Sequence, residues 1–522
     1  MSAGEFLDGR MLIDGKQADA SDGAFLDAVD PATEEVIGRV PAGTTEDVRL
    51  AAAAAERAAP AWAGLPPRDR ATALVEVAAA LRAERDRIVD LEVRDSGSTV
   101  RKLRLDIARA AESLEYYAGL AGELKGETVP ATARGLHFST REPYGVVGRI
   151  TPFNHPIFFA AGKMAAPLAA GNTMVIKPSE QTSLSACVLG EICGQVLPSG
   201  VVNIVTGMGA VAGDALVRDP RIRRIAFTGS VATGLALQRA AAEVNVKTLS
   251  LELGGKNPMV VFPDADLEAA LPAAVAGMNF SWAGQSCGSQ SRLFLHESIY
   301  DEGVARVAEL VDGLAVGDPR DPASDMGPVN SRAQYEKVLR HIDTALEDGA
   351  RLVAGGRSLR GERFPAGYWV APTVFADVTP DMRIFREEVF GPVLSIVRWS
   401  TPDEVVAMAN DVEYGLTASV WTRDLATALN TVHAIDAGYV WVNGVSAHFP
   451  GTSFGGVKNS GIGREEGIDE LFSYTQPKFV HVNAMTRWEG VGLPGRYRRP
   501  DPWSDSGRNA RQKRKDEGDG NS

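Results

Sequence analysis

Residues 145–177 read GVVGRITPFNHPIFFAAGKMAAPLAAGNTMVIK, in which a β-branched run, a helical segment and a second β-branched run follow one another. Three more β-branched runs lie at residues 201–205, 224–227 and 248–251, and helical segments at 183–196, 210–217 and 231–243 precede them in turn. Strands and helices that alternate at this spacing are typical of parallel strands joined by crossover helices. The stretch therefore predicts a doubly wound α/β sheet.

The chain on either side of this stretch predicts more structure of the same class. Residues 45–125 are helical in pattern, with an alanine-rich run from Glu46, apolar residues at three- and four-residue spacing from Arg68 to Glu92, and Thr44 or Thr45 as N-cap. A second strand-and-helix region begins near Pro258 and runs to about residue 445. Because 522 residues exceed what one hydrophobic core holds, we expect two doubly wound α/β domains.

The composition excludes several classes of protein. A formal charge of −13 argues against a general nucleic-acid binder. No apolar run approaches the ~18 residues of a membrane span, and the first residues lack the pattern of an export signal. Of the three cysteines, Cys187 and Cys193 lie in an apolar helical segment and are expected in the core, and none has metal-binding spacing. We therefore expect a cytoplasmic protein without a metal site.

The third cysteine, Cys287, is the most informative single residue. It lies among small and polar residues, Gly284-Gln285-Ser286-Cys287-Gly288-Ser289, where a thiol is open to a small molecule. Glu252 ends a strand-like run and is followed by Gly254 and Gly255. A nucleophile and a base at exposed backbone positions are the components of covalent catalysis, although a structural cysteine and a solvated glutamate are the alternative.

Three strand ends suggest a nucleotide site. Lys177-Pro178-Ser179-Glu180 follows one strand, Gly207-Met208-Gly209 a second, and Thr228-Gly229-Ser230-Val231-Ala232-Thr233-Gly234 a third. Ligands of open α/β sheets bind beyond the carboxyl ends of the strands, and glycine before a helix lets a pyrophosphate reach free N–H groups. A plain surface turn is the alternative for the lysine motif.

Two further motifs carry polar groups. Asn154, between Phe153 and His155-Pro156, lies on stiff backbone and suits a fixed hydrogen-bond donor for an oxyanion, or else satisfies turn backbone groups. Late in the chain, Glu387-Glu388-Val389-Phe390 pairs a carboxylate with an aromatic ring, and residues 454–465 form a glycine-dense loop.

Together these motifs resemble the NAD(P)-dependent aldehyde dehydrogenase superfamily over roughly residues 10–484. The resemblance implies that Cys287 is the nucleophile, that Asn154 and the backbone N–H of Cys287 form an oxyanion hole, that Glu252 is the general base, and that Lys163 assists a proton relay. An exposed surface charge is the alternative for Lys163.

The resemblance also implies the binding residues. NAD is the preferred cofactor, because the Glu180 carboxylate disfavours the 2′-phosphate of NADP. NADP stays open as the alternative. The implied cofactor-binding residues are Thr151, Pro152, Phe153, Lys177, Ser179, Glu180, Gly207, Gly209, Phe227, Thr228, Gly229, Ser230, Gly234, Leu253, Gly254, Glu388 and Phe390. The implied substrate-binding residues are His155, Phe159, Ser286, Gly288, His448 and Phe454, with Gly162 and Ser281 expected to widen the pocket.

The implied organisation is a Rossmann-like NAD-binding domain of residues 1–126 and 142–254, a catalytic domain of 255–455, and a small β oligomerisation flap of 127–141 and 470–484. The flap implies a homodimer or homotetramer, with Pro477 expected to shorten its last strand. Residues 485–522 contain few apolar side chains, a composition that predicts a disordered tail.

The expected reaction is oxidation of an aldehyde by NAD and water to the carboxylic acid, through a cysteine thiohemiacetal and thioester. A CoA-acylating semialdehyde dehydrogenase is an alternative, which Glu252 disfavours by resemblance. A cysteine hydrolase or esterase is a second alternative, which has no use for the Lys177 and Gly229 motifs.

Overall fold

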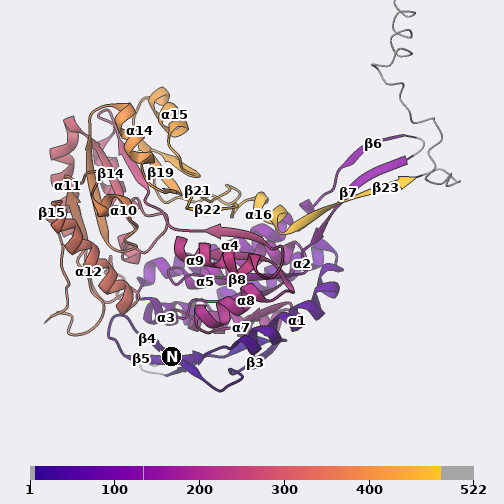
Figure 1. Cartoon of the computed structure of the whole chain (residues 1–522). Coiled ribbons are helices and arrows are strands. Elements are labelled where there is room, and N and C mark those ends of the chain that lie inside the picture. The colour runs from indigo at the N-terminus through magenta and orange to yellow at the C-terminus, as the bar shows by residue number, and fades with distance from the viewer. Residues whose placement is uncertain (1–5, 133–134, 362, 484–522) are drawn as a thin grey trace, which may run out of the picture. The chain divides into compact units, whose positions relative to one another are not determined.

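The computed structural model describes residues 6–132, 135–361 and 363–483, and Figure 1 shows their helices and strands. Residue contacts divide the chain into two compact units. The first comprises the described parts of Met1–Lys125 and Arg141–Gln476, and the second those of Gly126–Thr140 and Pro477–Ser522. The predicted tail, residues 485–522, lies outside the described residues.

The first unit contains an eight-stranded sheet. Its strand order is β22 (Gly461–Ile462), β12 (Thr248–Glu252), β11 (Ile222–Thr228), β8 (Val146–Ile150), β9 (Thr173–Lys177), β10 (Val202–Ile204), β2 (Met11–Ile13) and β3 (Lys16–Ala18). The five strands from β12 to β10 are parallel and are those that the β-branched runs predict. The chain passes from β8 outward to β10 and then returns to β11 on the other side of β8. The strand order therefore reverses between β8 and β11, where open sheets bind ligands.

Helices connect these strands as predicted. They are α5 (Pro156–Ala161), η2 (Gly162–Met164) and α6 (Ala165–Ala169) before β9, α7 (Leu184–Val196) before β10, η3 (Gly209–Gly213) and α8 (Asp214–Arg218) before β11, and α9 (Val231–Ala242) before β12. Cys187 and Cys193 on α7 are both buried, which confirms their predicted place in the core.

The helical region at the amino side comprises α1 (Thr45–Ala63), α2 (Pro67–Ala83), α3 (Arg85–Ser96) and α4 (Val100–Leu120). Thr44 is the N-cap of α1, and its side chain and that of Asp47 form a capping box. On α2, Leu74, Val77, Ala78 and Leu81 are buried at the predicted spacing of three and four residues. The helical pattern from Arg68 to Glu92 is divided at Glu84 into two helices.

A second sheet in the same unit has seven strands, in the order β15 (Arg351–Ala354), β16 (Thr373–Ala376), β17 (Val393–Trp399), β14 (Arg292–His296), β13 (Pro258–Val261), β19 (Thr417–Trp421) and β20 (Tyr439–Val442). All are parallel to their neighbours except β15. Its helices are α10 (Leu267–Gly277), α11 (Tyr300–Asp312), α12 (Arg332–Glu347), α14 (Pro402–Asn410) and α15 (Leu425–Ala434). The expected α/β class with two doubly wound sheets is confirmed.

One segment near the end of the first unit joins the two sheets. Strand β22 pairs with β12 of the eight-stranded sheet, and β21 (Val457–Lys458) pairs with β18 (Tyr414–Gly415), which precedes β19. Figure 1 shows β21 and β22 between the sheets, ahead of α16 (Ile468–Ser473). The glycine-dense loop of residues 454–465 is therefore part of the connection between the sheets.

A small three-stranded sheet contains β6 (Thr128–Thr132), β7 (Gly135–Pro143) and β23 (Thr475–Asn483), in the order β23-β7-β6. The expectation that Pro477 shortens the last strand is wrong, because β23 runs across it. Proline is tolerated there since β23 is an edge strand. A sheet of β1 (Leu7–Asp8), β5 (Val36–Pro41) and β4 (Phe25–Val29) was not predicted. Among the described helices, none has the length and apolar character to cross a membrane.

Candidate active site

Cys287 lies on the irregular connection between η4 (Phe280–Trp282) and β14. Amide side chains hold this connection in place. Asn257 donates from Nδ2 to the carbonyl oxygens of Cys287 (2.7 Å) and Ser289 (2.8 Å), and Asn154 donates to that of Gln285 (2.9 Å). Asn257 directly precedes β13 of the seven-stranded sheet and Asn154 follows β8 of the eight-stranded sheet, so the loop of Cys287 is fixed against both sheets.

The Cys287 thiol faces a cavity of about 310 Å³ and is partly exposed to it. Burial, together with the nearby carboxylates of Glu252 and Glu388, raises the pKa of this thiol to about 12. The thiol therefore keeps its proton near neutral pH unless a base removes it.

Glu252, the last residue of β12, lines the same cavity and is 5% exposed. Both of its carboxylate oxygens are buried, and neither has a hydrogen-bond partner within the described residues. Burial and the charge of Glu465 raise its pKa well above the ordinary 4.5. A buried, unpartnered carboxyl group with a raised pKa is suited to accept a proton near neutral pH.

A cluster of buried charges surrounds Glu252. Arg149 on β8 forms an ion pair with Glu465, and Lys163 lies with Nζ 3.0 Å from Glu465 Oε2 and 3.3 Å from Glu466 Oε1. Glu466 also accepts from His448 Nδ1, at 2.8 Å. Burial opposes ionisation of Glu465, but Arg149 and Lys163 outweigh it and hold the pKa of Glu465 at about 2. Lys163 therefore acts on Glu252 through its charge and does not line the cavity.

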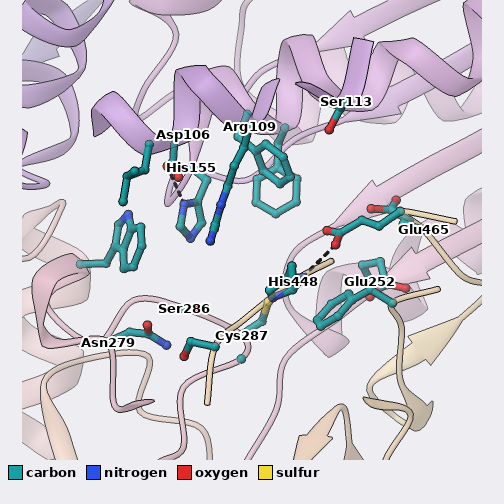
Figure 2. A pocket seen from close by; sticks show the side chains of 18 of the residues that line it. Asp106, Arg109, Ser113, His155, Glu252, Asn279, Ser286, Cys287, His448 and Glu465 are labelled. Atoms are coloured by element: carbon teal, nitrogen blue, oxygen red, sulfur yellow. Dashed lines mark hydrogen bonds and ion pairs between the residues drawn. The ribbon is translucent and has the colours of Figure 1, made fainter. Parts of the chain in front are cut away.

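The six predicted substrate residues come together in this cavity: His155, Phe159, Ser286, Gly288, His448 and Phe454 all line it. Figure 2 shows His155 on the side of α4 and Ser286 beside Cys287. His155 is 2.7 Å, Nδ1 to Oδ2, from Asp106 of α4. Gly162 and Ser281 are not among the lining residues; Gly162 packs against α4, where a Cβ would lie 3.3 Å from the Cα of Ala110.

The lysine motif after β9 forms a compact ion pair. Lys177 Nζ lies 2.8 Å from Glu180 Oε2, and Lys177 is 2% exposed. Gly209 approaches the pair, since a Cβ there would lie 3.9 Å from both carboxylate oxygens of Glu180. Thr151 joins the end of β8 to that of β9 by donating from N to the Lys177 carbonyl (3.0 Å). Two of the predicted glycine and lysine motifs are thus neighbours in space.

The Gly229 motif lies at the reversal point of the eight-stranded sheet. Ser230 is the N-cap of the twelve-residue helix α9 and accepts from the N–H of Thr233. A Cβ on Gly229 would overlap the ring of Phe227. The backbone of the turn between β11 and α9 is therefore not covered by a side chain at Gly229. The N-terminus of α9 begins there, and its free N–H groups favour an anionic group such as a pyrophosphate.

The Glu388 motif reaches the same region from the seven-stranded sheet. The backbone N–H of Gly255 donates to Glu388 Oε1 at 3.0 Å, and a Cβ on Gly254 would overlap the Glu388 carboxylate. Phe390, with φ of 54°, packs its ring edge-on against Phe153 at 5.6 Å between centroids. The cradle of glycines, helix N-terminus and two carboxylates fits a dinucleotide with two ribose rings.

Several residues of the site were not predicted from the sequence. They are Arg149, Glu466 and, lining the cavity from α4, Lys102, Asp106, Arg109 and Tyr116. Glu465 ends the glycine-dense loop and Glu466 follows it, and two successive carboxylates after glycines were a usable signal. The residues of α4 gave no such signal in the sequence, because a helix face exposed to solvent and a helix face that lines a cavity have the same polar composition.

Comparison with known proteins agrees with this geometry. Residues 18–480 match the sequence model of the aldehyde dehydrogenase family. The chain is 45% identical over 480 residues to aldehyde dehydrogenase tropH of Talaromyces stipitatus, spanning 91% of this chain and 93% of that protein. Among solved structures, PnpE from Pseudomonas sp. WBC-3 is 40% identical with a TM-score of 0.90, over 94% of this chain and 100% of that one. An aldehyde dehydrogenase from Bacillus cereus, solved with NAD+, is 37% identical with a TM-score of 0.89, over 92% and 97% of the two chains.

Proposed function

The chain belongs to the aldehyde dehydrogenase family and oxidises an aldehyde with NAD, and from this premise we propose that Cys287 is the covalent nucleophile and that the product is the free carboxylic acid. The observation that carries the proposal is Glu252, whose two buried, unpartnered carboxylate oxygens share one cavity with the Cys287 thiol. A base in that position can serve both the thiol and a water molecule.

In the first step Glu252, directly or through water, takes the proton of Cys287, and the sulfur forms a bond to the aldehyde carbon. The carbonyl oxygen becomes an alkoxide, which the backbone N–H of Cys287 and the second N–H of the Asn154 amide stabilise. The first N–H of that amide already donates to Gln285, which holds it in place. Loss of one such donor typically costs roughly 3 kcal/mol in the transition state.

Bound NAD, held by the Lys177–Glu180, Gly229–Ser230 and Glu388 motifs, would supply the acceptor for the hydride of the carbon attached to sulfur, and Cys287 would then hold the acyl group as a thioester. Glu252 releases its first proton to solvent. It then removes a proton from a water molecule as the water oxygen adds to the thioester carbon. The carbon–sulfur bond breaks, the acid leaves and the sulfur is ready to be protonated again. This second use of Glu252 favours water over coenzyme A as the acyl acceptor.

For the dinucleotide, we assign the Lys177–Glu180 pair to the adenosine ribose, the Gly229–Ser230 turn to the pyrophosphate, and Glu388 with Phe390 to the nicotinamide riboside. The eight-stranded sheet with residues 1–126 and 142–254 then forms the NAD-binding domain, and residues 255–455 the catalytic domain. We further propose a cytoplasmic homodimer or homotetramer that assembles through the small sheet of β6, β7 and β23.

The test is a comparison of wild-type protein with Cys287→Ala at 340 nm, with product identified by mass spectrometry in the presence and absence of coenzyme A. We expect NADH and free acid from wild type in both conditions. We expect no NADH from the variant, with NAD still raising its melting temperature. Acyl-CoA as product would support the acylating alternative, and ester hydrolysis without NADH would support a hydrolase.

A further inference from the structure

Helix α4 forms one wall of the cavity along its whole length. Its lining residues include Lys102, Asp106, Arg109, Ser113 and Tyr116, which recur every three or four positions and so share one face of the helix. In Figure 2 the Arg109 side chain points from α4 into the cavity beside His155, and Cys287 and Ser286 lie on the opposite wall. A guanidinium group therefore faces the nucleophile across the space that the substrate fills.

The Arg109 guanidinium has no counter-ion in the protein. It forms no hydrogen bond or ion pair with any residue of 6–132, 135–361 or 363–483. Asp106, three positions before Arg109 on the helix, is instead committed to His155 at 2.7 Å, and Glu112, three positions after it and also lining the cavity, forms no ion pair with Arg109. Five N–H donors in a fixed planar fork are thus free to bind a ligand.

Lys102 is a second cationic residue on the same face of α4. The Lys102 ammonium lies 4.9 Å from the ring centroid of Trp282, another lining residue. Burial, and after it the charge of Arg109, lowers the pKa of Lys102, so the two cations repel each other. An anion bound between them would relieve that repulsion.

We propose that the substrate is an aldehyde that bears a carboxylate at its far end, with the carboxylate bound by Arg109 and assisted by Lys102. A carboxylate matches the planar fork of arginine with two parallel hydrogen bonds. The aromatic side chains of Phe158, Phe159, Trp282 and Phe454 pack against the body of such a molecule, and a cavity of about 310 Å³ holds a short chain or a single ring. This assignment rests on the proposed function, because it places the aldehyde carbon at Cys287.

The test compares 4-formylbenzoate with its methyl ester, which has nearly the same shape without the charge. The measured quantity is the ratio of kcat/KM for the acid to kcat/KM for the ester. We expect wild type to favour the acid, and the ratio to fall about 50-fold in Arg109→Leu, mainly through KM, as for loss of a charge-assisted pair. Lys102→Met should lower the ratio less. Arg104→Leu, on the exposed face of the same helix and outside the cavity lining, is the matched control and should keep the wild-type ratio.

An equal ratio in wild type and Arg109→Leu would overturn the assignment, even with both aldehydes oxidised. If neither aldehyde yields NADH with wild type but short aliphatic semialdehydes do, the same ratio is measured with 6-oxohexanoate and hexanal, and the same fall is required. Failure of every aldehyde with wild type would contradict the proposed function instead. Arg109→Lys serves if the leucine variant does not fold; it keeps the charge, loses the fork and should lower the ratio by a smaller factor.

Discussion

The Lys163 ammonium lies 3.0 Å from a carboxylate oxygen of Glu465, and both side chains are at most 5% exposed. Arg149 pairs with the same carboxylate. This arrangement keeps Glu465 ionised close enough to Glu252 to act on it, and the pKa of Glu252 rises because of burial first and the Glu465 charge second. The protonation of Glu252, the proposed general base, therefore depends in part on Arg149 and Lys163, which do not line the cavity.

Glu252→Gln should separate the two halves of the reaction. The glutamine accepts a proton neither from the Cys287 thiol nor from water, so we expect a slowed burst of NADH followed by a steady-state rate that falls further, at least about 100-fold below wild type. Stopped-flow absorbance at 340 nm measures both phases, and mass spectrometry of the quenched burst should show the acyl group on Cys287. An equal loss of burst and steady state would mean that Glu252 acts on the thiol alone or holds the structure.

The pH dependence of deacylation should respond to the charge cluster with opposite signs. Glu252 is active when deprotonated and its pKa is raised, so the rate should rise with pH through a value above 4.5. Lys163 lowers that pKa and Glu466 raises it. Lys163→Met should therefore move the acid limb of kcat to higher pH, and Glu466→Gln should move it to lower pH. Shifts of the same sign in both variants would remove Glu252 from the acid limb.

Arg149→Met should destabilise the fold by about 3–5 kcal/mol, because it leaves a buried carboxylate short of its partner. Urea unfolding followed by fluorescence measures the change. Arg82→Met is the matched control: the Arg82–Glu115 pair is exposed at 45% and 41%, and its loss should cost less than about 1 kcal/mol. Similar losses in the two variants would contradict the role of burial.

Gly254→Ala should weaken NAD binding, because the added Cβ would overlap the Glu388 carboxylate and displace it from the Gly255 N–H. We expect the KM for NAD to rise about tenfold or more, as for loss of a hydrogen bond to a charged group. Gly213→Ala is the control, since a Cβ at Gly213 meets nothing within 4 Å. An unchanged KM would place Glu388 away from the cofactor.

Glu92 should make the fold less stable as pH rises. Burial raises its pKa to about 8, while the unfolded chain titrates near 4.5. Between those values the folded state holds a proton that the unfolded state has lost, so the free energy of unfolding falls by up to about 1.4 kcal/mol per pH unit. Glu92→Gln should flatten this slope between pH 5 and pH 8 in urea titrations, and the exposed Glu76→Gln should not. Equal slopes in the two variants would disprove the assignment.

Much of the fold followed from local patterns. Runs such as Thr173–Ile176 are β-branched, Thr44 can only cap a helix that begins beside it, and both effects act within a few residues. The motif around Cys287 was equally readable, because small residues beside a thiol indicate an accessible loop. The roles of Gly162 and Pro477 could not be predicted from the sequence, since each depends on which residues pack or pair beside it in the folded chain.

The amino-acid sequence by itself determined the alternation of strands and helices, the loop that carries Cys287 and the strand that ends in Glu252. Only the tertiary structure decided which charges surround Glu252 and which face of α4 lines the cavity. Arg149 and Glu465 are 316 positions apart, and a pKa depends on burial and on distances of a few ångströms. Those quantities exist only once the segment that carries β22 has paired with β12 and brought Glu465 to Arg149.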